Sequence, residues 1–127
     1  FDYRDGDWLS WVQEMTRKRG VDVVVDNVGK ATFQDSLKAL CRGGRLLTVG
    51  NTSGPKAEID IRYIFFKQLH IIGSTMGTPE EFRQVMSQVW AGRLSAVIDR
   101  VLPLAEGREA HLLLEQGVQF GKIVLTP

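Results

Sequence analysis

Cysteine is nearly absent from this sequence, and neither sign of charge is in excess. Cys41 is the only cysteine among 127 residues, which excludes an intrachain disulfide and a multi-cysteine zinc cluster. Sixteen lysines and arginines against fifteen acidic residues give a net charge of +1, scattered along the chain. No apolar run approaches the roughly 20 residues that span a bilayer. We therefore expect a protein of the reducing cytoplasm that binds neither nucleic acid nor membrane.

The beginning of the sequence is unusual. It opens at Phe1 without a methionine, and Phe1 and Tyr3 alternate with charged residues as at the end of a half-buried strand. The hydrophobic content of 43% is ordinary for a globular protein. We interpret the sequence as a piece of a longer chain.

Helices and strands are predicted to alternate. Apolar residues recur at helical spacing from Trp8 until Gly20, and a β-branched run follows from Val21 to Val28. A run so apolar is typical of a parallel strand buried on both faces. The further expected elements are a helix over 31–41, a strand over 45–49, helical turns within 59–67, a strand over 69–74, a helix from Pro79 to Gly92, and strand, helix and strand over 97–102, 110–116 and 123–125.

The fourth of these helices has the clearest start. Thr78 can cap it, Pro79 suits its first position, and Glu81 completes a capping box. Its apolar positions predict a buried stripe made by Phe82, Val85, Met86, Val89 and Trp90. The fold class is therefore α/β.

Small residues follow three of the predicted strands. They occur in Asn27-Val28-Gly29, Val49-Gly50-Asn51 and Ser74-Thr75-Met76-Gly77. Ligands of open parallel sheets bind beyond the carboxyl ends of the strands. A nucleotide fits there, yet turns need glycine in any case, and the fingerprint G-x-G-x-x-G is absent. The residues alone leave both readings open.

No catalytic or metal-binding constellation is apparent. His70 begins a strand that we expect to be buried, and His111 with Glu115 reads as a surface pair on a helix. Cys41 reads as a small core residue, and Ser53-Gly54 lacks the nucleophile-elbow pattern. No histidines or cysteines have the spacing of metal ligands.

Five segments in register resemble the cofactor domain of medium-chain dehydrogenases/reductases. Two are Gly20 to Gly29 and Gly43-Gly44-Arg45-Leu46, and Lys67-Gln68-Leu69 with Ile72 to Gly77 resembles the quinone-oxidoreductase-like branch. The segments at 97–101 and 121–125 agree in order and spacing. The resemblance implies part of a Rossmann fold, a doubly wound parallel sheet, over residues 1–96. It also implies a return segment over 97–127 that packs on an upstream catalytic domain.

The same resemblance implies a cofactor site. Asn27, Val28 and Gly29 would line the ribose and nicotinamide of NADP or NAD. Backbone groups of Val49-Gly50 and Ser74-Thr75-Met76 would meet the nicotinamide amide. Lys122 would approach from the return segment, where a cation suits a phosphate-bearing ligand; a solvated surface lysine is the alternative.

The activity implied is hydride transfer from the cofactor to a quinone or an activated alkene or carbonyl. The branch leans to NADP, and no zinc is expected in this chain. In this family two subunits pair through the edge strand, here Leu69 to Ser74, which predicts a homodimer.

Two alternatives remain. An S-adenosylmethionine-dependent methyltransferase also places a Gly-Gly-Arg-Leu segment such as Gly43 to Leu46 after a helix, although the Gly73–Gly77 and Gly121–Leu125 segments oppose it. The other is a catalytically inert fragment that only dimerises, because an exposed strand edge invites association.

Overall fold

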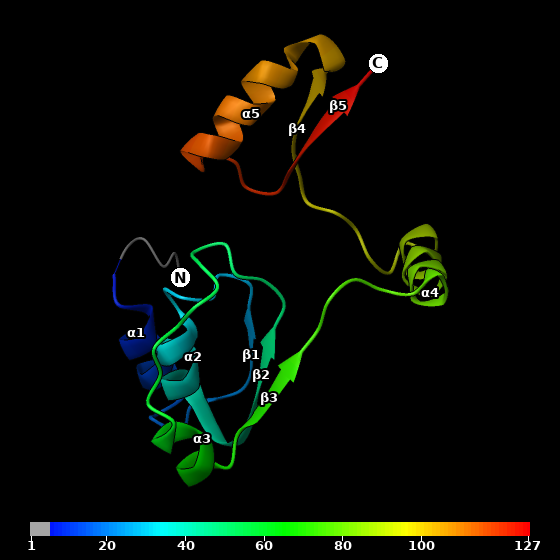
Figure 1. The fold of residues 1–127 in the computed structure, drawn as a ribbon. Helices are drawn as coiled ribbons and strands as arrows, with labels where there is room; N and C mark the ends of the chain where they lie inside the picture. Colours follow the sequence, from blue (N-terminus) through cyan, green and yellow to red (C-terminus); the bar gives the residue numbers. More distant parts are fainter. Residues whose placement is uncertain (1–5) are drawn as a thin grey trace. The chain divides into compact units, whose positions relative to one another are not determined.

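The computed structural model describes residues 6–127, so the expectation for Phe1 and Tyr3 lies outside the described residues. The chain divides into two compact units, one ending at Met76 and the other beginning at Gly77. Each combines helices with a parallel sheet, which confirms the α/β fold class (Figure 1).

The first unit contains a three-stranded parallel sheet of order β1-β2-β3 within the described residues. Val24 of β1 lies opposite Leu46 of β2, which lies opposite Ile71 of β3. Its elements are α1 (Trp8–Met15), β1 (Val21–Asp26), α2 (Phe33–Ala39), β2 (Leu40–Thr48), α3 (Arg62–Lys67) and β3 (His70–Gly73).

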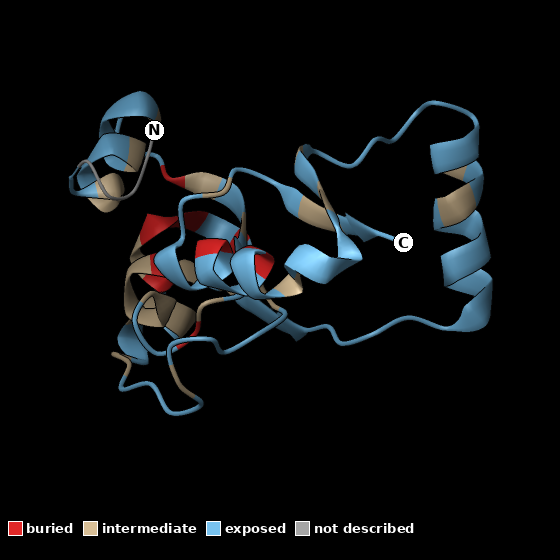
Figure 2. Ribbon diagram, turned by 90° about the horizontal axis from the view of Figure 1, so that it is seen from above, coloured by how far each residue is buried: buried red, intermediate tan, exposed pale blue. Residues whose placement is uncertain are grey.

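The core of this unit lies on one face of the sheet. Leu37 of α2 and Leu40 and Leu46 of β2 are almost fully buried, and Val24 packs against them. Val23 and Val25 point to the other face and are 45% and 66% exposed. Figure 2 colours the buried residues red and the exposed ones pale blue. The prediction that β1 is buried on both faces is therefore wrong for the described unit, because only one face carries a layer.

Two predicted helix ends are also wrong. Helix α1 ends at Met15 rather than Gly20, because Arg17 and Lys18 adopt positive φ angles of 51° and 63°. Helix α2 ends at Ala39, and β2 already begins at Leu40, which pairs with Val21. Strand pairing thus overrides the helical spacing of the apolar residues after Ala39.

The second unit contains α4 (Pro79–Trp90), β4 (Ile98–Pro103), the 3₁₀ turn η2 (Leu104–Glu106), α5 (Gly107–Gln116) and β5 (Lys122–Thr126). Strands β4 and β5 pair in parallel, and the Thr78–Glu81 capping box is present as predicted.

The predicted buried stripe of α4 is wrong. Phe82 and Trp90 are 65% and 77% exposed, and no residue of α4 is buried, since no element of the second unit packs extensively against this helix. None of the helices within residues 6–127 is both long and apolar enough to cross a lipid bilayer.

Candidate functional site at the carboxyl ends of the strands

The three predicted binding segments lie side by side at one edge of the sheet. The Val49 N–H donates to the Asp26 carbonyl oxygen at 3.0 Å, and the Ser74 N–H donates to the Thr48 carbonyl oxygen at 3.0 Å. These bonds continue the parallel ladder just beyond the last residues of the strands. The structure therefore brings the segments at Asn27, Val49 and Ser74 together, as predicted from the strand order.

A buried carboxylate organises the first of these loops. Asp26 is only 3% exposed, and its Oδ1 accepts hydrogen bonds from the N–H groups of Val28 and Gly29, both at 2.9 Å. The Thr32 hydroxyl donates to both carboxylate oxygens, and the Ser36 hydroxyl donates to Oδ2 at 2.8 Å. One side chain thus ties the loop after β1 to the first turn of α2.

The charge on this carboxylate is favoured. Burial by itself raises the pKa of Asp26, but the hydrogen bonds from Gly29, Ser36, Thr32 and Val28 outweigh burial and hold the pKa below its ordinary value. A buried charge with this many donors is a fixed part of the loop rather than a titrating group at neutral pH.

The sequence analysis did not identify Asp26, because in the sequence it is one polar residue within the apolar run from Val21 to Val28. The signal was present in the spacing. An acidic residue ends the strand, and hydroxyl side chains follow at Thr32 and Ser36, where the next helix begins. Hydroxyl donors at a helix start can satisfy a carboxylate at the preceding strand end.

The loop after β2 is bonded to the loop after β1. Ser53 donates to the Val28 carbonyl oxygen from its N–H at 2.9 Å and from its hydroxyl at 2.7 Å. The same hydroxyl accepts from the Ala31 N–H at 2.9 Å. Ser53, which the sequence offered only as a failed nucleophile, therefore positions the backbone of the candidate site.

Two glycines allow the loops to approach this closely. A Cβ on Gly50 would lie 2.8 Å from the Asn27 carbonyl oxygen, closer than side-chain atoms tolerate. Gly29 has a φ of 84°, which favours glycine, and a Cβ there would lie 3.0 Å from the Asn51 Cα. Both positions require glycine, which explains the predicted pattern.

A hollow lies on each side of the Asn27–Gly29 loop. One, of about 290 Å³, is lined by Gly29, Lys30, Phe33, Thr48, Gly50, Asn51, Gly54, Pro55, Ala57 and Ile59. The other, of about 440 Å³, is lined by Trp8, Val24, Val25, Asp26, Asn27, Val28, Ala31, Thr32 and Ser36. Both linings combine loop residues at the strand ends with one aromatic side chain, Phe33 in the first and Trp8 in the second, which suits a flat, extended ligand lying across the strand ends.

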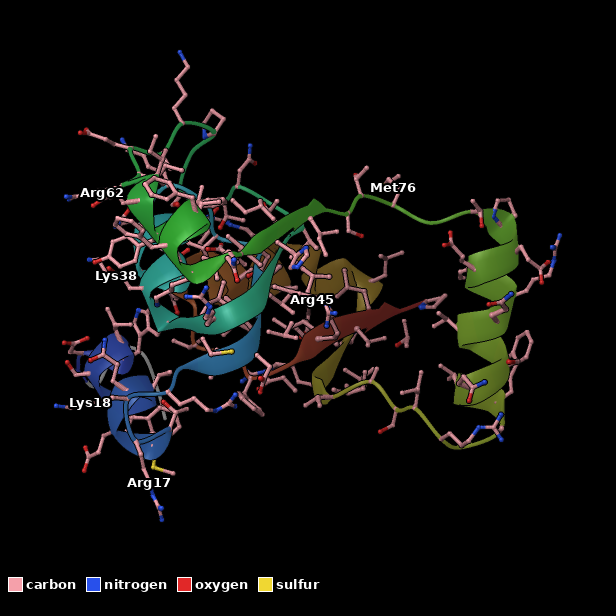
Figure 3. All side chains as sticks on the ribbon, turned by 90° about the horizontal axis from the view of Figure 1, so that it is seen from below. Arg17, Lys18, Lys38, Arg45, Arg62 and Met76 are labelled. Carbon is pink, nitrogen blue, oxygen red and sulfur yellow. The ribbon has the colours of Figure 1, made fainter. Side chains whose placement is uncertain are left out.

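The remaining predicted site residues are exposed. Thr75 follows the end of β3, and Met76 is 96% exposed with a φ of 55° (Figure 3). Lys122 opens β5 in the second unit, where its N–H donates to the Val97 carbonyl oxygen at 2.8 Å. Its approach to a ligand of the first unit stays a prediction.

The other chemical candidates have ordinary surroundings. Cys41 is buried, as expected, but His70 is exposed, which corrects the expectation of a buried strand, because β3 has no buried residue. Within residues 6–127 no three His, Cys, Asp or Glu side chains gather in a way that could hold a metal ion. The described residues therefore do not fit a zinc site.

Comparison with known proteins shows which proteins this chain resembles. A profile of the family described as zinc-binding dehydrogenase matches residues 1–125. The human (Homo sapiens) quinone oxidoreductase is 29% identical over 132 residues, which covers 98% of this chain and 40% of that protein.

Solved structures agree with the described fold. A structure of an NAD-dependent alcohol dehydrogenase has a TM-score of 0.85 and 37% identity, covering 98% of this chain and 36% of that one. The 2-octenoyl-CoA carboxylase reductase CinF, solved in complex with NADP and 2-octenoyl-CoA, has a TM-score of 0.83 and 30% identity, covering 93% and 26%. The chain spans about two fifths or less of the length of the curated relatives it matches.

Proposed function

The chain belongs to the zinc-binding dehydrogenase family, within the medium-chain dehydrogenases/reductases, and on this premise we propose that it forms the nicotinamide end of the cofactor site of an NAD(P)H-dependent oxidoreductase. The observation that carries the proposal is the joining of three glycine- and small-residue loops at the carboxyl edge of a parallel sheet. Ligands of such sheets bind at this edge.

Each loop has a part in holding the cofactor. Asn27, Val28 and Gly29, fixed by Asp26, line the ribose and the nicotinamide. Backbone groups of Val49-Gly50 and of Ser74-Thr75-Met76 bind the carboxamide, and Lys122 of the return segment adds a positive charge near the phosphates.

The bound cofactor supplies the hydride, and the chain supplies position. A nicotinamide bound here would be held by the backbone groups of Val49-Gly50 and Ser74-Thr75-Met76 and would supply the hydride. The hydrogen bond from the Ser53 hydroxyl to the Val28 carbonyl oxygen would keep two of these loops in place. We assign no catalytic side chain among residues 6–127.

We take NADP as the cofactor and a quinone or an activated alkene or carbonyl as the hydride acceptor. Residues 1–96 form the C-terminal part of the cofactor domain, and residues 97–127 form the segment that returns to the catalytic domain. The enzyme works in the cytoplasm as a homodimer joined along the Leu69–Ser74 edge. The exposed β3 edge supports the dimer, because its outer backbone groups need partners.

Calorimetric titration of the chain with NADPH, NADH and S-adenosylmethionine tests the cofactor directly. We expect NADPH to bind and the Gly50→Ala variant to bind at least about tenfold more weakly, because its Cβ pushes against the Asn27 carbonyl oxygen. Gly107→Ala, whose Cβ meets only a side-chain atom of Leu125 at 3.7 Å, is the matched control and should bind normally. Binding of S-adenosylmethionine without NADPH would contradict the proposal and favour a methyltransferase.

A further inference from the structure

A further cavity lies at the opposite edge of the sheet, near the amino ends of β1 and β2. It has a volume of about 430 Å³ and includes Gly20, just before β1, and Cys41, at the start of β2. Its full lining is Gln13, Lys18, Arg19, Gly20, Lys38, Leu40, Cys41, Arg42, Tyr63 and Lys67. The proposed cofactor site lies at the other ends of these strands, so the two sites share no residue.

The lining is strongly cationic. Five of its residues are lysine or arginine, and none is aspartate or glutamate. Arg19 forms an ion pair with Asp22 at 2.7 Å, and Lys38 pairs with Asp35 at 2.8 Å and is also attracted by Asp7. The other three lining cations have no carboxylate partner within the described part of the chain, 6–127.

Helix capping explains part of this cluster. The Lys67 ammonium donates to the carbonyl oxygens of Lys38 and Leu40 at 2.8 and 2.7 Å, where α2 ends. Lys38 lies in the last turn of the same helix, where a cation is favoured. Both residues therefore stabilise α2 whether or not a ligand binds.

Lys18 and Arg42 have no such role. Lys18 is exposed and adopts a φ of 63°, in the left-handed region that disfavours a residue with a side chain. Arg42 is exposed, and its only described side-chain bond is a long one of 3.4 Å to the Phe66 carbonyl oxygen. Figure 3 shows Lys18 and Lys38 projecting on the same side of the first unit, from the turn after α1 and from α2.

We propose that this cavity binds a small phosphorylated metabolite, a ligand with two or more negative charges. Lys18 and Arg42 provide cationic donors that have no carboxylate partner among residues 6–127, and the Lys67 ammonium adds to the positive potential. The Tyr63 hydroxyl and the Gln13 amide are neutral donors in the lining. The volume suits a phosphate ester or diphosphate and is too small for a folded partner. The ligand sits away from the hydride-transfer edge, so it is not the nicotinamide cofactor.

Inorganic pyrophosphate is the probe for this site, followed through the amide signals of the isotope-labelled chain by NMR. We expect shifts confined to the amides of Lys18, Gly20, Lys38, Cys41 and Arg42, which weaken as salt is raised. Shifts at Gly29 and Gly50 instead would assign phosphate binding to the cofactor edge and overturn the proposal. Absence of saturable shifts would overturn it as well.

Two exposed substitutions test the residues. Lys18→Gln and Arg42→Gln should each weaken pyrophosphate binding by about tenfold, because each removes one charged donor. Arg108→Gln, in α5 of the second unit, removes the same charge elsewhere and should leave the dissociation constant unchanged. Equal weakening by all three variants would mean a nonspecific charge effect and would contradict the proposed site.

Discussion

At the scale of single residues, Asp26 accounts for most of the order in the candidate site. It is buried at the end of β1 and accepts hydrogen bonds from two backbone N–H groups and two hydroxyls. The conformation of the Asn27–Gly29 loop therefore depends on Asp26, at the end of β1.

Asp26→Asn should lower the free energy of unfolding by about 2 kcal/mol, because the amide nitrogen cannot accept the bonds that one carboxylate oxygen now accepts. Urea unfolding followed by circular dichroism measures this loss. The control is Asp22→Asn, in the same strand, whose exposed carboxylate pairs with the exposed Arg19 guanidinium and accepts a weak 3.5 Å contact from the Cys41 thiol. An equal loss in both variants would contradict the special role of Asp26.

The pH dependence of stability follows from the same carboxylate. The folded-state pKa of Asp26 is lowered, so its contribution is fully present above the ordinary aspartate pKa of about 3.9 and is lost as pH falls through the folded value. Stability measured between about pH 5 and pH 2.5 should fall less steeply for Asp26→Asn than for the unaltered chain. If the stability of both proteins fell equally as the pH was lowered, the folded-state pKa of Asp26 would be an ordinary one and the prediction would be contradicted.

At the scale of elements, the sequence predicts the order of helices and strands better than their ends. Its alternation gives β1, α3 and β3 in the right places, and Thr78 with Glu81 marks the start of α4. Strand β2 is also predicted, but it begins at Leu40 rather than Arg45. The positions at which α1 and α2 end depend on contacts between residues that are distant in sequence. Gly20 lies so close to the Ala39 carbonyl oxygen that a Cβ would be 2.7 Å away, and no local pattern contains that contact.

Burial is the property that the sequence predicts least well. The apolar run of β1 indicates burial on both faces, yet its Val25 is largely exposed. The apolar stripe of α4 indicates burial on one face, yet its Trp90 is largely exposed as well. Periodicity reports which faces are apolar, but what covers a face is decided by elements elsewhere.

The link between α3 and α2 gives a prediction at this scale. Lys67→Met should lower the free energy of unfolding by about 2 kcal/mol, because the carbonyl oxygens at the end of α2 lose a charged donor. Lys56→Met, in an exposed part of the loop after β2, is the control and should have little effect under the same denaturant titration. An unchanged free energy of unfolding in Lys67→Met would contradict this prediction, because water would then replace the ammonium without loss of stability.

At the scale of the whole molecule, the candidate site could be predicted only in part. The strand ends at Gly29 and Gly50 followed from topology, and the family resemblance added their roles. Asp26 and Ser53 were missed, because the loop N–H groups, the Val28 carbonyl oxygen and the hydroxyls that they bond to are brought together only by the fold. The assignment of Lys122 depends on how a return segment meets a cofactor, which no local pattern specifies.

The proposed homodimer gives a sharp test of the β3 edge. Ile72→Lys places a charge on the outer strand of the sheet and should shift the chain from dimer to monomer by at least about tenfold in dissociation constant. Val23→Lys, on the same open face but on β1, is the control, since the two residues are 41% and 45% exposed. Sedimentation equilibrium measures the masses. Dissociation by Val23→Lys alone would place the interface at β1 and contradict the proposal.

The central claim is that a nicotinamide cofactor lies across the ends of β1, β2 and β3. Titrating the isotope-labelled chain with NADPH and mapping the amide shifts tests it most directly. The account predicts saturable shifts at Gly29, Gly50 and Thr75. Saturable shifts confined to Gly20 and Cys41, or none, would contradict it.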